Sequence, residues 1–129
     1  MNTPQELDER LSKMPARGTP DTRTLLDKGD ELPEMVNLNN IAGGNYINPD
    51  HEAPGTFLNQ INRGKSFLFD LTQSIAKGEK DIAGAQPIRL AKINGEYFVT
   101  EDGHHRVSAL KALGVPFAPM LVTHYKSKA

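Results

Sequence analysis

The sequence has no cysteine, no long apolar run and no surplus of basic residues among its 129 residues. Without cysteine there can be no disulfide, no cysteine-ligated zinc and no thiol nucleophile, which fits a reducing compartment. A membrane-spanning helix needs about 18 consecutive apolar residues, and no segment comes near that length. We therefore expect no membrane partner and no cleaved leader.

Charge is almost balanced, with 15 basic and 16 acidic residues and a net charge of −1. Domains dedicated to duplex nucleic acid usually carry a basic surplus, so strong non-specific binding of nucleic acid is disfavoured, although a local basic patch is compatible with this balance. Hydrophobic residues make up only 37%, and nine prolines and eleven glycines favour extended or loop segments. This composition predicts one modest core.

The first half of the chain predicts a helical and loop-rich extension over residues 1–66 that packs on a core formed by residues 67–129, in a single globular unit. Residues 3–14 predict a short helix, because Thr3 and Glu6 have the spacing of a capping box. A second short helix is expected to begin at Asp21 and to stop before Pro33. The Asn-, Gly- and Pro-rich residues 34–56 predict a loop with at most one short strand.

Residues 56–77 predict two short helices that are separated at Gly64. In the second of them Phe67, Leu71 and Ile75 recur every four residues, and Leu68 lies beside them. That spacing is typical of an amphipathic helix, so we expect these three side chains to face a core.

From residue 88 onward the pattern changes to strands and one further helix. Asn94-Gly95 is a strong hairpin signal, and strand-like residues lie on both sides of it. A helix is expected over residues 106–113, ended by Gly114, and a last strand over residues 117–125. The fold class predicted is α+β, with helices packed on a small mixed β-sheet.

The most informative stretch is VTEDGHHRVSALKALGV, in which an apolar strand turns into a helix. The first turn of a helix has unpaired amide N–H groups and a positive dipole end, and both favour an anion such as phosphate. Gly103 would let the backbone approach the ligand, and Arg106 supplies a forked cation suited to phosphate. His104 and His105 add hydrogen-bond donors or proton-transfer groups.

Two other interpretations of this stretch remain open. In the first, Asp102 is only the N-cap of the helix, the histidines are solvated and Arg106 pairs with Glu101. In the second, the stretch binds a metal ion. A transition-metal site built from His104 and His105 with His124 or His51 is disfavoured, because adjacent histidines in one turn diverge. Mg²⁺ held by Glu101 or Asp102 beside a bound phosphate is more compatible with these residues.

Residues 67–125 resemble the ParB N-terminal/sulfiredoxin-like superfamily, which includes the ParB-like nuclease domain. The matching motifs are a helix that ends in Ser-Ile, a following Pro-Ile, a hairpin, a Gly-His-x-Arg junction and a helix that ends in Leu-Gly. In this sequence they are Ser74-Ile75, Pro87-Ile88, Asn94-Gly95, Gly103-His104-His105-Arg106 and Leu113-Gly114. No counterpart of residues 1–66 is assigned.

The resemblance implies that Gly103, His104, His105 and Arg106 contact phosphate. Members of the superfamily include CTP-hydrolysing partition proteins, ATP-using sulfiredoxins, free-serine kinases and ParB-like nucleases. Sulfiredoxin chemistry needs a cysteine that is absent here, and a full partition protein carries further domains that we do not expect for these 129 residues.

The first functional prediction is a ParB-like nuclease that hydrolyses phosphodiester bonds of nucleic acid, DNA in the first instance, as a toxin or effector domain. Such a protein would act in the cytoplasm, its own or that of a target cell. Its predicted catalytic residues are His104, His105, Glu101 and Asp102, of which Glu101 and Asp102 would hold Mg²⁺. Its predicted nucleic-acid contacts are Arg63, Lys65 and Arg89.

Two alternatives use the same phosphate site. One is an NTPase or small-molecule kinase that binds ATP or CTP, which suits the neutral charge better. The other is a non-catalytic module that binds a nucleotide or a protein. A protein partner, such as an immunity or inhibitor protein, is expected to dock on the N-terminal half.

Overall fold

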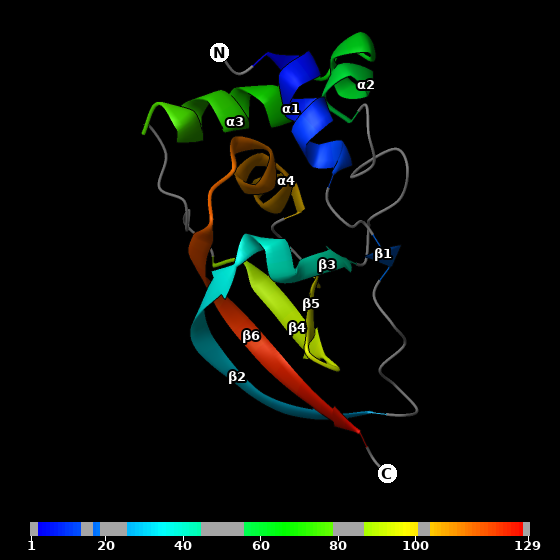
Figure 1. Ribbon diagram of the computed structural model, residues 1–129, viewed down its shortest axis with the longest axis vertical. Coiled ribbons are helices and arrows are strands. Elements are labelled where there is room, and N and C mark those ends of the chain that lie inside the picture. The colour runs from blue at the N-terminus through cyan, green and yellow to red at the C-terminus, as the bar shows by residue number, and fades with distance from the viewer. Residues whose placement is uncertain are drawn as a thin grey trace.

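The computed structural model describes residues 3–13, 17–18, 26–44, 56–78, 87–100 and 104–127. It shows a mixed α+β fold, as predicted, in which a layer of helices covers one end of a β-sheet (Figure 1). The helices are α1 (Pro4–Ser12), α2 (Thr56–Asn62), α3 (Phe67–Ala76) and α4 (His104–Leu113), with a short 3₁₀ turn η1 (Leu38–Asn40). The strands are β1 (Arg17–Gly18), β2 (Leu26–Asn37), β3 (Ile41–Gly44), β4 (Arg89–Ile93), β5 (Glu96–Val99) and β6 (Phe117–Ser127). None of the described helices is long and apolar enough to cross a membrane.

The strands form one mixed sheet in the order β1-β3-β5-β4-β6-β2. β4 pairs antiparallel with β5 and parallel with β6, while β6 and β2 form a long antiparallel ribbon. The hairpin between β4 and β5 turns at Asn94 and Gly95, whose φ angles are 52° and 81°. Two consecutive positive φ angles are the requirement of a type I′ turn, so the hairpin prediction is confirmed.

The core lies between α4 and the sheet. Val107 and Leu110 of α4 are fully buried against Leu90 and Val122, which lie side by side on β4 and β6. Side chains alternate between the two faces of a strand, so Ala91 and Ile93 belong to a smaller cluster on the opposite face. The sheet therefore has a helix-covered face and an outer face.

Residues 26–37 form strand β2, and the predicted helix that ends before Pro33 is wrong for this segment. The predicted loop likewise gives way to the end of β2, to η1 and to β3 up to residue 44. β2 pairs with β6 from Leu26↔Ser127 to Asn37↔Phe117. This pairing joins segments about 90 residues apart in sequence, and such long-range contacts override weak local propensities. The sheet thus takes strands from both sides of residue 66.

Helix α3 packs through most of the predicted stripe, but its first residue lies outside the core. Leu68 and Thr72 are buried, and Ile75 is half-buried against the core, but the side chain of Phe67 is 61% exposed. Its neighbour α4 lies along the Leu68 side, where Leu68 clusters with Ala112. The prediction that Phe67 faces the core is therefore wrong.

Polar contacts hold the helices to one another. The buried carboxylate of Asp8 on α1 accepts hydrogen bonds from the backbone N–H groups of Phe57 (2.7 Å) and Leu58 (3.1 Å) in the first turn of α2. Two residues further along α1, Arg10 donates to the carbonyl oxygen of Ala112 in the last turn of α4, at 2.9 Å. An anion at a helix N-terminus and a cation at a helix C-terminus both complement the helix dipole.

Local capping signals work as predicted at two helix ends. Thr3 and Glu6 form the capping box of α1, with the Glu6 N–H donating to the Thr3 hydroxyl oxygen at 3.2 Å. At the end of α4 the N–H groups of Gly114 and Val115 donate to the carbonyl oxygens of Lys111 and Leu110. This is a Schellman motif, and Gly114 supports it with a φ of 75°.

Candidate functional site

The candidate site lies where β5 leads into α4. Thr100, which directly follows β5, donates its backbone N–H and its hydroxyl to the carbonyl oxygen of Arg89, at 3.2 and 3.3 Å. These bonds hold the end of β5 against the start of β4. α4 then begins at His104. A helix therefore begins within a few residues of the end of the strand, as predicted, and the N-terminal end of a helix favours an anion.

The position of α4 is fixed by burial and by one buried lysine. Val107, Ser108 and Leu110 are all 1% exposed or less. The ammonium group of Lys111 is buried and donates to the carbonyl oxygen of Ile41 on β3. Because β3 pairs in parallel with β5, this bond anchors the helix to the neighbour of the strand that precedes it.

An exposed aromatic side chain lies beside the first turn of α4. The ring of Phe67, in the first turn of α3, meets the ring of His105 edge-on, with centroids 5.5 Å apart and an interplanar angle of 87°. His105 is exposed, and Phe67 is 61% exposed. A ligand at this helix end would therefore meet a flat apolar surface as well as an imidazole.

Only part of the predicted site falls within the described residues. Glu101, Asp102 and Gly103 lie outside them, and so does the side chain of His104. His105 is exposed, Arg106 is half-buried, and both make contacts within the protein. The roles assigned to all six residues remain predictions.

The three predicted nucleic-acid contacts do not share one face. Arg63 and Lys65 are exposed in the turn between α2 and α3. Arg89 is exposed on β4 and alternates with buried Leu90, so its side chain is on the outer face of the sheet.

Metal ligands are not gathered anywhere in the described ranges, where no group of three or more His, Asp or Glu residues could hold an ion. Glu101, Asp102 and His51 lie outside these ranges, so the Mg²⁺ prediction stays a prediction. His124, the distant histidine considered for a metal site, lies on β6. Its Nε2 atom is 3.3 Å from Oε1 of Glu34 on β2.

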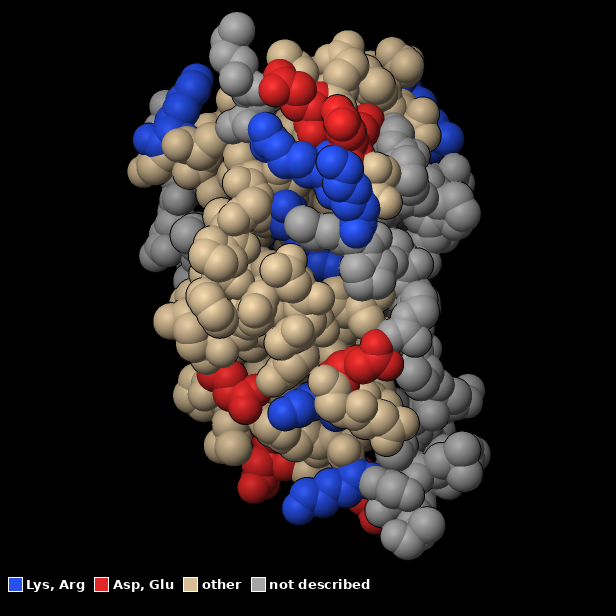
Figure 2. Space-filling model, viewed as in Figure 1, with Lys and Arg blue, Asp and Glu red and all other residues tan. Residues whose placement is uncertain are grey.

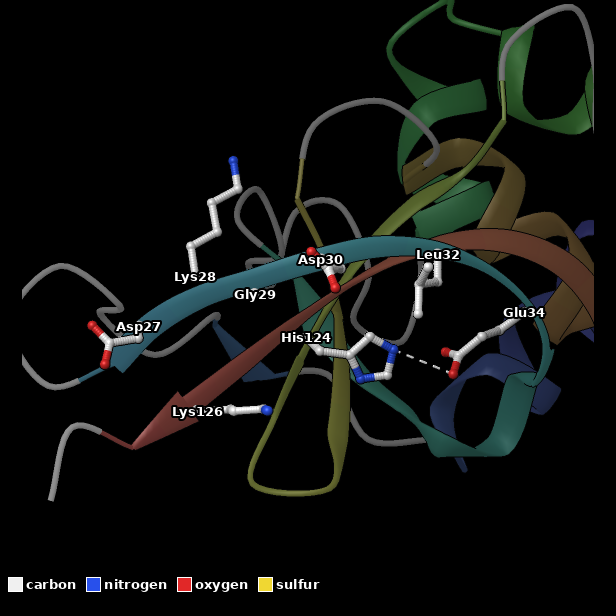
Figure 3. A pocket seen from close by; sticks show the side chains of 8 residues that line it. All are labelled: Asp27, Lys28, Gly29, Asp30, Leu32, Glu34, His124 and Lys126. Atoms are coloured by element: carbon white, nitrogen blue, oxygen red, sulfur yellow. Dashed lines mark ion pairs between the residues drawn. The ribbon is translucent and has the colours of Figure 1, made fainter.

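This histidine lines a separate cleft of about 440 Å³ between β2 and β6 (Figure 3). Glu34 points along the ribbon toward His124, with Asp30 and Leu32 beside the pair. The Glu34–His124 pair was missed by the sequence analysis. Its members are 90 positions apart on strands whose pairing no local pattern reveals.

Comparison with protein-family models, with curated proteins and with solved structures found no match.

Proposed function

We propose that this protein binds nucleotide phosphates at the first turn of α4 and hydrolyses phosphodiester bonds there, as a ParB-like nuclease. The observation that carries the proposal is the arrangement of His105 and Phe67 at that turn. An imidazole stands at the helix end that favours an anion, and an exposed aromatic ring lies 5.5 Å from it. Phosphate and base are the two parts of a nucleotide that these groups would recognise.

In the proposed complex the phosphate lies at the positive end of the α4 dipole, against the first turn of the helix, with the Arg106 guanidinium beside it. A base stacks on the exposed face of Phe67, and stacking of this kind tolerates any base sequence. Gly103 would allow close approach of the backbone. The Mg²⁺ that Glu101 and Asp102 are predicted to hold would neutralise charge on the phosphate.

In the proposed reaction His105 accepts a proton from a water molecule as the water oxygen attacks phosphorus. The new P–O bond forms while the bond to the leaving oxygen breaks, and that oxygen takes up a proton, for which His104 is the candidate donor. Arg106 and the helix amides stabilise the charge that develops on the phosphoryl oxygens.

A second candidate function is hydrolysis or transfer of a phosphate from ATP or CTP at the same place. Two observations favour it over cleavage of nucleic acid. The net charge is −1, and the exposed basic residues are dispersed, with Arg89 on the outer face of the sheet and Arg63 and Lys65 in the turn between α2 and α3. A mononucleotide needs no extended basic track.

The test is to incubate the protein with plasmid, RNA, ATP and CTP, each with Mg²⁺ and with EDTA. Nuclease activity predicts nicked plasmid or shortened RNA, which His105→Ala should reduce about 100-fold or more and Arg106→Ala to a similar extent. Nucleotide turnover without cleavage supports the second candidate. If turnover survives both substitutions, the proposed site is wrong.

Phe67 offers a test of binding alone. Phe67→Ala should weaken binding of a nucleotide about tenfold, because stacking on one aromatic ring contributes about 1–3 kcal/mol. Phe117→Ala is the matched control, since Phe117 is 54% exposed and lies on β6. Equal effects of the two substitutions would contradict a role for Phe67 in stacking.

A further inference from the structure

Strand β2 stands at one end of the sheet. It is 12 residues long, and in the part of the chain that the structure describes it has β6 on one side and no strand on the other. A long edge strand presents backbone groups that another chain can pair with. The ribbon of β2 and β6 also extends away from the helices, so no described helix covers this edge (Figure 1).

The register shows which residues point their backbone groups outward. Leu121 of β6 donates its N–H to the carbonyl oxygen of Ile88, on the β4 side, at 2.9 Å. In an antiparallel ladder, two facing residues either bond to each other or both point their backbone groups away from the pair. Leu121 points to β4, so the backbone carbonyl of its partner Pro33 points away from β6, to the open edge. By the alternation of a strand, Glu31 and Met35 face the same way. Pro33 has no N–H, but the N–H groups of Glu31 and Met35 are directed to the open edge.

The two faces beside this edge differ in character. On the outer face, four exposed apolar residues form a patch that we call the outer stripe: Pro33, Met35, Phe117 and Pro119. Uncharged residues also cover most of the middle of the face shown in Figure 2. On the other face Glu34 lies next to the cleft, and its Oε2 atom is buried without a hydrogen-bond partner in the described structure. A buried oxygen of this kind gains from a donor supplied by a ligand.

The strand carries an excess of negative charge. It contains four acidic residues against one lysine. Two copies of β2 paired with each other would gather eight carboxylates against two lysines in one strand pair, and repulsion between like charges destabilises such a pair. A second copy of this chain is therefore a poor occupant, and a basic strand is a good one.

We propose that the open edge of β2 is a docking site for an extended segment of a partner protein in which basic and apolar residues alternate. The segment adds to the sheet as a seventh strand by pairing with the N–H groups of Glu31 and Met35. Its apolar side chains lie along the outer stripe. Its lysine or arginine side chains lie on the other face, where they reach Glu34 and Asp30. This proposal is independent of the reaction proposed at α4.

The first test measures binding of a labelled eight-residue peptide of alternating lysine and valine by fluorescence anisotropy. We expect it to bind, and to bind at least tenfold better than a peptide of alternating glutamate and valine. A lysine–valine peptide with N-methylated backbone amides has the same charge but cannot pair as a strand. If the methylated peptide binds equally well, attraction of charge alone explains the result and the proposal is wrong.

Matched variants separate this edge from the rest of the surface. Asp30→Lys should weaken binding about fivefold or more, while Glu9→Lys makes the same charge change on exposed α1 and should change it less than twofold. Met35→Pro removes an outward N–H without touching the pairing to β6, and should weaken binding at least tenfold. Equal losses with Asp30→Lys and Glu9→Lys would overturn the proposal.

Hydrogen exchange gives a direct readout at the edge. The amides of Glu31 and Met35 should exchange rapidly in the free protein and more slowly when the lysine–valine peptide is bound. The amides of Leu32 and Val36, which face β6, serve as internal controls and should not change. Slow exchange at Glu31 and Met35 in the free protein, together with the mass of a dimer, would show that a second copy occupies the edge and would overturn the proposal.

Discussion

The helical end of the molecule and the β2–β6 ribbon are stabilised in different ways. At the helical end, helices distant in sequence are joined by buried polar bonds, such as that from Asp8 to the start of α2. Leu110 of α4 is fully buried there. On the ribbon, in contrast, Leu32 and Met35 are 50% and 67% exposed, and the only described neighbour of β2 in the sheet is β6.

This difference separates a region in which buried side chains supply stability from a strand edge that is open to solvent. Burial of apolar side chains between α4 and the sheet supplies the main stabilising free energy, and the buried polar bonds set how the helices are oriented. The part of the ribbon around Leu32 and Met35 gains less from burial, because these side chains face water. Substitutions should therefore have unequal effects in the two regions.

The largest contrast is expected between two leucines. Leu110→Ala should lower the free energy of unfolding by about 3 kcal/mol, because it leaves a cavity under α4. Leu32→Ala, on the exposed ribbon, should change it by less than about 0.5 kcal/mol. Chemical denaturation of the two variants measures both values, and equal effects would show that the ribbon is as important for stability as the core.

The next effect concerns the bond between α1 and α2. Asp8→Ala should destabilise the protein by about 2 kcal/mol, because a buried N–H group and a partly buried one at the start of α2 lose their acceptor. Asp8→Asn keeps one acceptor oxygen and should cost less. Glu9→Ala, next to it on the exposed face of α1, is the control and should change stability little.

A smaller effect is expected at Gly29, where the register of the β2–β6 pairing shifts. A Cβ atom at Gly29 would overlap the carbonyl oxygen of His124, so Gly29→Ala forces the two strands apart. We expect a loss of about 1–2 kcal/mol, with Asp30→Ala as the exposed neighbouring control. If Gly29→Ala is as stable as the native protein, the ribbon yields more easily than the helical end does.

The smallest effect is electrostatic and lies at the start of α1. The Thr3 hydroxyl donates a hydrogen bond to the Glu6 carboxylate, and this bond is the main reason why the pKa of Glu6 lies below its usual value. The hydrogen bond from the Thr3 backbone N–H is the second cause. Because the pKa of Glu6 is lower in the folded than in the unfolded protein, Glu6 stabilises the fold fully at pH values above its unfolded-state pKa. This stabilisation is lost as the pH falls through the folded-state pKa. Thr3→Ala should raise the Glu6 pKa, which an NMR titration of the side-chain carboxyl carbon measures. An unchanged pKa would contradict this cause.

Features set by neighbouring residues were predictable from the sequence. Asn94-Gly95 predicted the hairpin because few residue pairs accept two consecutive positive φ angles. Thr3 with Glu6, and Gly114 at the end of α4, predicted helix ends for equally local reasons. The start of α4 near residue 104, on which the candidate site depends, belongs to the same class.

Features set by contacts between distant residues could not be predicted from the sequence. The leucines near residue 26 and the following Pro33 were compatible with a short helix, and only pairing with β6 makes this segment a strand. The spacing of Phe67, Leu71 and Ile75 indicated an apolar stripe on α3 but could not show that its first residue lies outside the core. Phe67 was therefore assigned to a core although it lies exposed beside His105.

The sequence by itself determined the turns, the caps, the order of elements in the second half and the place where a strand leads into α4. The tertiary structure alone decided that β2 forms the edge of the sheet, that Glu34 lies beside His124 and that Phe67 lies beside His105. The physical reason is the range of the interactions. Backbone conformation at a turn or cap depends on a few adjacent residues, whereas burial and strand pairing depend on what the folded chain brings together.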